Sequence, residues 1–445
     1  MSEIKNERVK INKNPDQIAS DLMRPVNLSI GFKAWMAFLI ISFAVCIYAY
    51  TKQLKTGLGV TGLRDYVSWG MYIANFVFFV AAALIGMLIS AVLGLIGIKW
   101  ITPLARIAEI IAVAFAAVAG LVIISDMGRP DRLPYVFMYG RIQSPILWDI
   151  TVVTTYFVMS FLLYFLPLIP DLSIGKDKLK EMPKIFRWIY DFFSLNWVGS
   201  KEQVQIIHKS VRILLILIIP VAFAIHTVTS WLFAMTVRAG WDSTIFGPYF
   251  LTGAFVAGCA AVIIAMYFFQ KNYKLKDYIT DFHFDKMGKL LVLVSVVYLY
   301  FNINEFLVPG YKLKHADAIH LKSIFVGHWA LTFWLTQLLG LVIPTILLLF
   351  KKIRKAFPML IISIFVLVGA WVKRYIIVIP TQEHPFLPIQ NVPEYFHGYT
   401  PTLIETAITL ASFILVLIII TILSKFFPVI PIWETIEENK NDLSA

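Results

Sequence analysis

The chain has 445 residues, of which 59% are hydrophobic and 15% are charged, and its mean hydropathy is +0.76. A soluble domain has about 25% charged residues, and a chain this apolar could not bury its hydrophobic side chains within a soluble particle. The composition therefore predicts an all-α polytopic membrane protein. Its two cysteines, Cys46 and Cys259, exclude an iron–sulfur cluster held by this chain alone, which takes about four thiolates. We assign the net charge of +12 to loops that set membrane topology and not to nucleic-acid binding.

A membrane-spanning helix needs about 20 mainly apolar residues, and ten segments meet this criterion. The predicted spans are residues 32–50, 66–95, 103–125, 149–169, 206–232, 246–270, 287–308, 325–350, 357–380 and 402–424. They leave an N-terminal segment (1–31), a ten-helix domain (32–424) and a C-terminal tail (425–445), with a polar insert (171–205) inside the domain. We therefore expect no soluble catalytic domain.

The distribution of Lys and Arg predicts the orientation. Ten spans place both termini on one side of the membrane. If that side is the cytoplasm, cytoplasmic segments hold 25 of the 39 basic residues, outer loops hold ten and the spans hold four. Cytoplasmic loops are enriched in Lys and Arg, so we expect both termini to be cytoplasmic.

The polar insert contains an amphipathic pattern. Its apolar residues recur at helical spacing and are Ile185, Trp188, Ile189, Phe192 and Phe193. This pattern predicts a helix that lies on the cytoplasmic membrane surface or packs against another subunit.

The fourth span carries a polar stripe. Its five members fall within an arc of about 80° at 100° per residue, and they are Asp149, Tyr156, Ser160, Tyr164 and Asp171. Asp149 is expected at the outer end of the helix and Asp171 at the inner end. One interpretation is a proton path that runs from Asp171 through Tyr164, Ser160 and Tyr156. The other is a polar seam that holds neighbouring helices together.

Further polar residues of several spans fall in the outer half of the membrane under this orientation. Together with Asp149 they are Asp65, Tyr72, Asp126, Arg129, His226, Glu305, His328 and Arg374. Lys373, beside Arg374, is instead a candidate for snorkelling to the interface. Acids, a histidine and an arginine next to an apolar, lipid-accessible cavity suit a quinone, whose two ring oxygens need hydrogen bonds and proton exchange. We expect no haem, because His226 and His328 alone could not provide the two ligand pairs that electron transfer across the membrane needs.

Several motifs occur along the chain in a fixed order. They are GLRDYVSWGMYIANFVFF within residues 57–79, SDMGRP from Ser125, SPILWD from Ser144, HTVTSW from His226, AGWDSTIFGPYFLTGA from Ala239, WVKRYIIVIP from Trp371 and FFPVIPIWE from Phe426. In order and spacing they resemble the polysulfide reductase membrane-subunit family of the NrfD/PsrC type. The resemblance is greatest to its ten-helix branch, found in alternative complex III and the quinone reductase complex. The chain departs from that branch at Ser125–Asp126, at Leu232 and at 83–86, where His, Asp and His-Ala-Gly often stand.

The resemblance implies two four-helix bundles, at about 66–232 and 246–380, with flanking helices. It implies a quinone or quinol (menaquinone or ubiquinone) bound at the outer face, with Asp149, His226 and Arg374 as the site residues, and no metal in this chain. It also implies an extracytoplasmic iron–sulfur partner within a molybdopterin-type or multihaem cytochrome complex, in a bacterial or archaeal cytoplasmic membrane.

Two other classes stay open at this stage. A secondary transporter would have helices broken at matching positions of two halves and a midplane site, and Pro220 and Pro344 are candidate breaks. A structural membrane anchor would have no quinone site.

The charge asymmetry makes a direct prediction about topology. Reporter fusions near residue 180 and at the C-terminus should report the cytoplasm, while fusions near residues 135 and 390 should report the outside, because the basic loops stay inside. An outside signal near residue 180 would reverse the orientation.

Overall fold

The computed structural model describes residues 7, 9, 11–26, 29–176, 184–385 and 389–443, and the side chains of all of these except 87, 88 and 441–443. Within these residues every regular element is helical, which confirms the predicted all-α class. The α-helices are α2 (Pro15–Leu22), α3 (Ile30–Thr56), α4 (Met71–Ala83), α5 (Gly94–Ile96), α6 (Thr102–Asp126), α7 (Leu133–Tyr139), α8 (Pro145–Phe165), α9 (Leu168–Lys176), α10 (Lys184–Phe193), α11 (Lys201–Ala234), α12 (Phe246–Asn272), α13 (Asp281–Lys312), α14 (His315–Phe325), α15 (Ala330–Gln337), α16 (Ile343–Leu348), α17 (Ala356–Val378), α18 (Leu403–Phe426) and α19 (Ile432–Leu443).

Nine helical segments of the described chain are long and apolar enough to cross a membrane, and α4 is a shorter apolar helix. The second predicted span starts later than expected, because α4 begins at Met71 and not at residue 66. A π-helical segment, Met87–Leu93, then leads into α5. The eighth predicted span is likewise divided into α15, a π-helical segment (Leu338–Val342) and α16.

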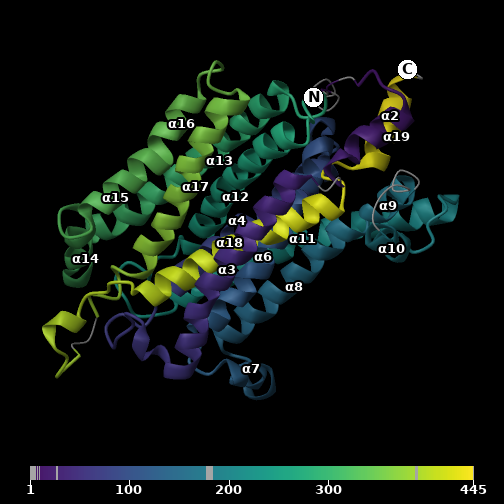
Figure 1. The fold of residues 1–445 in the computed structure, drawn as a ribbon. Helices are drawn as coiled ribbons and strands as arrows, with labels where there is room; N and C mark the ends of the chain where they lie inside the picture. Colours follow the sequence, from purple (N-terminus) through teal and green to yellow (C-terminus); the bar gives the residue numbers. More distant parts are fainter. Residues whose placement is uncertain are drawn as a thin grey trace.

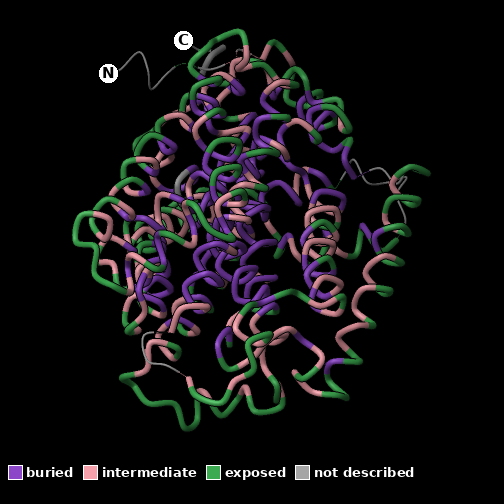
Figure 2. The backbone as a smooth tube through the Cα atoms, turned by 90° about the vertical axis from the view of Figure 1, so that its left-hand side faces the viewer, coloured by how far each residue is buried: buried purple, intermediate pink, exposed green. Residues whose placement is uncertain are grey.

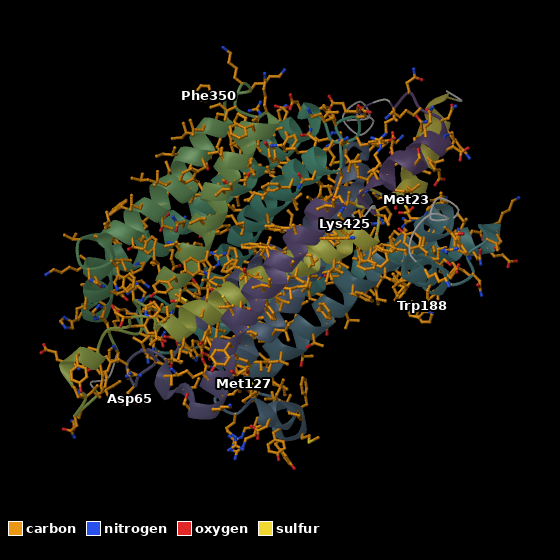
Figure 3. The ribbon with its side chains drawn as sticks, viewed as in Figure 1. Met23, Asp65, Met127, Trp188, Phe350 and Lys425 are labelled. Atoms are coloured by element: carbon orange, nitrogen blue, oxygen red, sulfur yellow. The ribbon has the colours of Figure 1, made fainter. Side chains whose placement is uncertain are left out.

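The helices run lengthwise through an elongated bundle whose two ends carry different segments (Figure 1). Both termini, α9 and α10 lie at one end, which we call the terminal end. The short helices α7 and α14 lie at the other, which we call the opposite end. Figure 3 places Met23, Trp188 and Phe350 toward the terminal end and Asp65 and Met127 toward the opposite end. This arrangement puts α9, α10 and α19 on one side and α7 and the loop before α18 on the other.

The centre of the bundle is built from helices that are apolar on every side. Every residue of α4 is buried, and α6 and α12 are mostly buried, whereas α3 buries only Leu39 and Gln53 (Figure 2). The small residues of the second span permit close packing. A methyl group added at Gly86 would lie 2.7 Å from the Cβ of Ala112, so α6 approaches to a distance that only glycine tolerates there.

Contacts group the spanning helices into two sets. In the first, α4 packs on α6, α6 on α8, and α8 on α11. In the second, α12 packs on α13 and α17, and α13 and α17 both contact α16. The sets meet where α12 contacts α4 and α11, while α3 and α18 pack together alongside α4 and α6.

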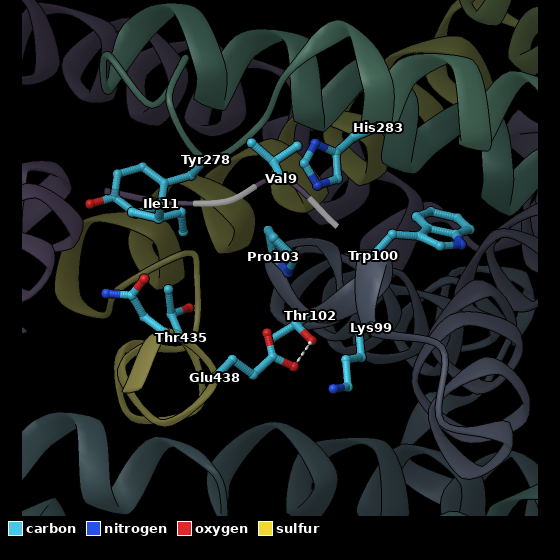
Figure 4. Close-up of a pocket in the computed structure, with 11 residues that line it drawn as sticks. Val9, Ile11, Lys99, Trp100, Thr102, Pro103, Tyr278, His283, Thr435 and Glu438 are labelled. Atoms are coloured by element: carbon cyan, nitrogen blue, oxygen red, sulfur yellow. Dashed lines mark hydrogen bonds between the residues drawn. The ribbon is translucent and has the colours of Figure 1, made fainter. Parts of the chain in front are cut away.

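The terminal segments are folded against the bundle and are not free tails. Helix α19 contacts α2, α6 and α9, and Asn439 donates a 2.9 Å hydrogen bond to the carbonyl of Lys13. Thr102 donates a 2.9 Å hydrogen bond to Glu438 at a small pocket of about 30 Å³ between these segments (Figure 4). The C-terminal segment thereby closes the terminal end of the bundle.

The amphipathic insert forms α10. Its inward face is Phe186 and Tyr190, and Phe186 stacks on Phe426 of α18. Trp188 and Phe192 on the other side are about 60% exposed, which leaves an apolar face for lipid or another subunit. Residues 177–183 of the insert lie outside the described residues.

Docking of α19 should depend on pH through Glu434. Burial raises the pKa of this carboxyl to about 7 from its ordinary 4.5, and Asp171, Glu437 and Glu438 add to the rise while Arg106 opposes it. The pKa of Glu434 is higher in the folded chain than in the unfolded one. The contribution of this carboxyl to the stability of the fold is therefore complete below about pH 4.5 and is lost as pH rises through about 7. We expect the melting temperature to fall more between about pH 5 and about pH 8 in the wild type than in Glu434→Gln, since glutamine resembles the protonated acid. Parallel pH curves for the two proteins would contradict this account.

Candidate functional site

The predicted site residues Asp149 and His226 lie on neighbouring helices near the opposite end. Asp149, on the second turn of α8, is 3% exposed, and its Oδ1 accepts a 2.6 Å hydrogen bond from Thr229 Oγ1 on α11. His226 lies one turn before Thr229 on the same helix and is 2% exposed. The Nε2 atom of His226 has no hydrogen-bond partner among the described residues. The α8–α11 packing therefore brings a buried carboxylate and a buried imidazole into one region.

Arg374 reaches this region from α17. Its side chain is 2% exposed, its guanidinium lies 5.7 Å from the ring centre of Phe250, and it is within electrostatic range of His226. Its Nε and Nη2 atoms have no hydrogen-bond partner in the part of the chain that the structure describes. Because a buried guanidinium without acceptors is costly, this position is suited to a group that can accept hydrogen bonds. We call Asp149, His226, Thr229 and Arg374 the acid–imidazole cluster.

An aromatic group near the opposite end connects α11, α12, α17 and the segment before α4. Trp241 stacks on Trp69 at 5.7 Å and meets Phe233 edge-on at 5.0 Å between ring centres. Trp241 donates a 2.7 Å hydrogen bond to the carbonyl of Ile377 on α17. The Gln382 amide donates to the carbonyl of Trp69 at 2.6 Å and accepts from its backbone N–H at 2.9 Å. This group closes the acid–imidazole cluster on the side of the opposite end.

Lys373 is buried and does not snorkel, contrary to the interpretation offered from the sequence. It is 4% exposed, and its ammonium lies 4.7 Å from the ring centre of Phe306 and 5.1 Å from that of Phe333. The predicted site residue Glu305 on α13 is also buried and interacts electrostatically with it. Both Lys373 and Arg374 line a small space beside Gly253 of α12 and Tyr298 of α13, and Arg374 is also within electrostatic range of His226 of α11.

A separate polar cluster holds the predicted residues Tyr72 and Asp126. Tyr72 donates a 2.6 Å hydrogen bond to Gln53, and both Asp126 and Glu405 lie within electrostatic range of the Tyr72 hydroxyl. Glu405 is fully buried and accepts hydrogen bonds from Tyr399 Oη at 2.6 Å and from the backbone N–H of Gly62 at 2.8 Å. The single outer pocket predicted from the sequence is thus divided into distinct clusters.

Three predicted pocket residues lie outside these clusters. Asp65 is exposed in the loop before α4, whereas Tyr72 is buried on that helix. Arg129 is exposed and pairs with Asp131 at 2.9 Å. His328 is exposed in the turn before α15, whereas the nearby His320 of α14 is buried.

The polar stripe of the fourth span is divided between two helices. Tyr156 donates a 2.8 Å hydrogen bond to the carbonyl of Ala83, where α4 ends. The hydroxyls of Ser160 and Tyr164 are buried and have no partner among the described residues. Asp171 lies on α9, because α8 ends at Phe165, and it is 0% exposed.

Asp171 forms the centre of a buried ion cluster near the terminal end. Its Oδ2 lies 3.0 Å from Nη1 of Arg106, which is also 0% exposed, and its Oδ1 accepts from the backbone N–H groups of Ile432 and Trp433. Glu109 approaches the same guanidinium at 3.7 Å. Asp171 thus anchors the start of α19 and is shielded from solvent there, unlike the open cytoplasmic end that the sequence led us to expect.

Sequence reasoning missed several members of these clusters. They are Gln53, Arg106, Glu109, Tyr399, Gln382 and Glu405. Arg106 and Glu109 lie three apart on an otherwise apolar helix, and this i, i+3 charge pair was a usable signal. Gln53, Tyr399, Gln382 and Glu405 lie at helix ends or in loops, where no periodicity marks them.

The space beside Arg374 is small. A pocket of about 20 Å³ lies between Gly253, Tyr298, Gln337, Lys373 and Arg374, which is room for about one water molecule. A much larger pocket, of about 780 Å³, lies elsewhere, between α3, α6, α12 and α18. A ligand at the acid–imidazole cluster must therefore enter by displacing side chains at the edge of the helix pair.

Comparison with known proteins identifies the family. The polysulphide reductase, NrfD family matches residues 59–385. The chain belongs to this family. It is 29% identical to a putative dimethyl sulfoxide reductase membrane subunit of Halobacterium salinarum, over 75% of this chain and 73% of that protein. It is 24% identical to a selenate reductase subunit of Mesobacillus selenatarsenatis, over 88% and 93% of the two chains, and 23% identical to the integral membrane subunit of a menaquinone reductase of Nitratidesulfovibrio vulgaris, over 90% and 92%. The matches confirm the resemblance drawn from the motifs.

The position of Arg374 depends on a glycine in α12. A methyl group at Gly253 would lie 2.8 Å from Arg374 Nη2 and 2.8 Å from the Tyr298 ring, so Gly253→Ala should displace the guanidinium. Overpacking of this kind costs roughly 1–3 kcal/mol, and we expect a lower melting temperature. Gly247→Ala is the matched control on the same helix, because its nearest neighbours would be 3.9 Å away. Equal melting temperatures for the two variants would show that the Arg374 contact is loose.

Proposed function

We propose that this chain is the quinone-interacting membrane subunit of a respiratory oxidoreductase complex and that the acid–imidazole cluster binds the quinone ring. The observation that carries the proposal is a series of buried neighbours on three helices. Asp149 of α8 accepts a hydrogen bond from Thr229 of α11, His226 lies one turn from Thr229, and Arg374 of α17 is within electrostatic range of His226. Two of these groups present buried nitrogens without a hydrogen-bond partner among the described residues. Buried polar atoms are normally paired, so unpaired ones near a single carboxylate favour a ligand that completes them.

The residues present fit a quinone ring. A quinone takes up two electrons and two protons at its ring oxygens, and this is the chemistry it would supply when bound. Arg374 can only donate hydrogen bonds, while either nitrogen of His226 donates or accepts according to its tautomer. Asp149, already oriented by Thr229, can accept a proton or a hydrogen bond. The set therefore offers donors for the oxidised ring and acceptors for the reduced one.

The α8–α11 seam provides a lateral route to the cluster. Trp148 and Trp231 flank the seam and meet edge-on at 6.3 Å, and Trp231 is 38% exposed on the bundle surface. Ile146 and Met235, at the same end of the seam, are more than half exposed. Because the isoprenoid tail of a quinone stays in the lipid, entry between these two helices requires movement only of the side chains at the edge.

Menaquinone is the quinone we favour. One relative that matches nearly the full chain is named a menaquinone reductase subunit, and the other two are named as subunits of oxyanion or sulfoxide reductases. A ubiquinone would need the same hydrogen bonds, so this choice rests on the relatives and not on the cluster.

We place the electron-transfer partner outside the membrane, at the opposite end. With two cysteines this chain cannot hold an iron–sulfur cluster alone, so electrons pass to or from an iron–sulfur subunit of a molybdopterin-type or multihaem cytochrome complex. Helix α7 offers a docking surface there, because its large apolar residues are mostly exposed. They are Tyr135, Phe137, Met138 and Tyr139.

We also propose that the divided stripe conducts protons between the Asp171 cluster and Asp149. Tyr156, Ser160 and Tyr164 lie between them on one face of α8, and two of these hydroxyls are buried without a partner among the described residues. Hydroxyls can both donate and accept, so with intervening water they can form a relay.

The geometry does not favour a transporter. Pro220 lies inside α11, which runs unbroken from Lys201 to Ala234. The π-helical segments Met87–Leu93 and Leu338–Val342 belong to the first helix of one set and the third of the other, so they do not occupy matching positions. The unpaired buried nitrogens also disfavour a structural anchor. Burying them costs free energy, and a purely structural role offers nothing that would offset this cost.

Loss of either acid–base group of the cluster should slow quinol turnover. We expect Asp149→Asn and His226→Ala each to lower the turnover of the assembled complex by roughly 10²-fold, the usual scale for a positioned acid or base. Quinol oxidation or quinone reduction by the purified complex measures the effect. Assembly should survive, because neither change alters a helix face that packs against a partner.

The matched control is Asp191→Asn on α10. This carboxylate is exposed and pairs with Lys176 at the terminal end, where an exposed ion pair contributes little. If assembled Asp149→Asn turns over quinol at the control rate, the ring binds elsewhere.

The proton path is tested by Tyr164→Phe, which removes one of these buried hydroxyls and keeps the ring. In detergent the turnover should be unchanged, while the membrane potential generated in proteoliposomes should fall, because the relay is interrupted. Tyr190→Phe is the control, since its buried hydroxyl contacts Met23 Sδ and lies off the stripe. Equal potentials from the two variants would exclude the path.

A further inference from the structure

A pocket much larger than the space beside Arg374 lies away from the acid–imidazole cluster. Its volume is about 780 Å³, within the range of about 300–1,000 Å³ that is usual for sites of small molecules. Its walls are apolar side chains of α4, α6, α12 and α18, among them Phe78, Ile111, Phe115, Ala265 and Phe413. It lies in the half of the bundle nearer the terminal end, where α3 begins and α12 and α18 end.

The pocket is open to the surroundings of the bundle. Trp35 of α3, Phe268 of α12 and Leu417 of α18 line it and are each more than 40% exposed. Helix α3 is the most exposed of the long helices and packs chiefly on α18. A chain-like apolar molecule from the bilayer can therefore enter beside α3.

The end of the pocket nearer the termini is polar and positively charged. Lys425 of α18 lines it, donates a 2.9 Å hydrogen bond to the carbonyl of Pro25, and lies 5.1 Å and 5.0 Å from the ring centres of Phe32 and Tyr273 (Figure 3). Tyr273 Oη and Ser424 Oγ are 2.9 Å apart and lie beside it. An ammonium and hydroxyl donors thus meet at the mouth of an apolar cavity.

The charge of the described lining residues is of one sign. No Asp or Glu is among the described residues that line the pocket. Lys33, Lys271 and Lys274 are exposed and adjoin the lining residues Phe32, Asn272 and Tyr273 in sequence. A basic pocket between membrane helices attracts an anionic lipid headgroup by about 1 kcal/mol per Lys near the surface.

We propose that this pocket is a binding site for an anionic phospholipid, with an acyl chain in the apolar cavity and the phosphate at Lys425 and the neighbouring lysines. The charge complementarity selects this occupant: a neutral quinone ring could accept a hydrogen bond from one lysine, whereas a phosphate is permanently charged and is attracted by the whole row of lysines. The bound lipid would fill the space between α3 and the bundle, so α3 is held in place partly by lipid. The site is independent of the quinone proposal.

Trp35 provides a reporter, because its indole lines the pocket and donates to Thr421 Oγ1 at 3.3 Å. The full chain is reconstituted in phosphatidylcholine vesicles with brominated phosphatidylglycerol or brominated phosphatidylcholine. The Trp35 signal is the fluorescence of the wild type minus that of Trp35→Phe. We expect the anionic lipid to quench this signal at an about fivefold lower mole fraction than the neutral one, the ratio that corresponds to about 1 kcal/mol.

Two variants separate a built site from general lipid contact. Lys425→Gln should abolish the preference for the anionic lipid, whereas Lys351→Gln, an exposed lysine in the turn between α16 and α17, should keep it. Ala265→Phe should fill the cavity and reduce quenching by both lipids. Equal quenching by the two lipids in the wild type, or a preference that survives Lys425→Gln in protein that remains monodisperse, would overturn the proposal. Displacement of the brominated phosphatidylglycerol by menaquinone at equal mole fraction would also overturn it, since the pocket would then belong to a quinone.

Discussion

The cost of placing polar groups inside an apolar helix bundle governs this structure. A charged or hydrogen-bonding side chain that faces lipid or an apolar core must find partners within the protein, because water is absent. The buried polar groups of this chain are of two kinds, paired and unpaired. Some groups are paired and hold the bundle together, while others have buried atoms without a hydrogen-bond partner among the described residues, and these occur on several helices that include α6, α8, α11, α13 and α17.

Glu405 and Asp171 are examples of buried acids that are paired with backbone groups. Each is fully buried, and each carboxylate accepts two backbone N–H groups at a point where the chain turns, Glu405 from Gly62 and Thr402 and Asp171 from Ile432 and Trp433. Replacement of either carboxylate would leave backbone N–H groups unpaired, so both acids hold loops against the bundle. Their burial alone therefore says little about catalysis.

His226 and Arg374 are examples of buried groups with unpaired nitrogens. Their nitrogens without a partner among the described residues are not at a chain turn. His226 lies one turn from Thr229, which donates a hydrogen bond to Asp149, and Arg374 is within electrostatic range of His226. The aromatic group of Trp69, Phe233 and Trp241 closes this region from the opposite end, which leaves the lipid side as the route of access. Arg106 also has buried nitrogens without a hydrogen-bond partner among the described residues, but its guanidinium is ion-paired with Asp171 and Glu109. Arg374 is in no ion pair among the described residues, and this difference supports a quinone at the acid–imidazole cluster.

The sequence predicted the helical class and the apolar segments, because apolar runs are local signals. The three central residues of the candidate site came from the resemblance of short motifs to the family, and their role stays a prediction. The sequence misplaced Asp65 and His328 because helix boundaries depend on tertiary contacts. Helix α4, for example, begins at Met71, whose backbone N–H donates a hydrogen bond to Tyr399 Oη. Tyr399 lies in a loop more than 300 residues further along the chain. The sequence also assigned Lys373 to the interface, because a lone lysine in an apolar run gives no sign of the aromatic rings of Phe306 and Phe333 that surround it. Partners supplied by distant loops, such as Gln53 and Glu405, leave no periodic pattern and need the structure.

Photoaffinity labelling with an azido-menaquinone tests the central claim most directly. The assembled complex is irradiated with the probe, digested and mapped by mass spectrometry, with unlabelled menaquinone as competitor. We predict competitor-sensitive labels on α8 near Asp149, on α11 near His226 and on α17 near Arg374. Competitor-sensitive labels confined to other segments, such as the pocket between α3 and α18, would contradict the assignment of the acid–imidazole cluster as the quinone site.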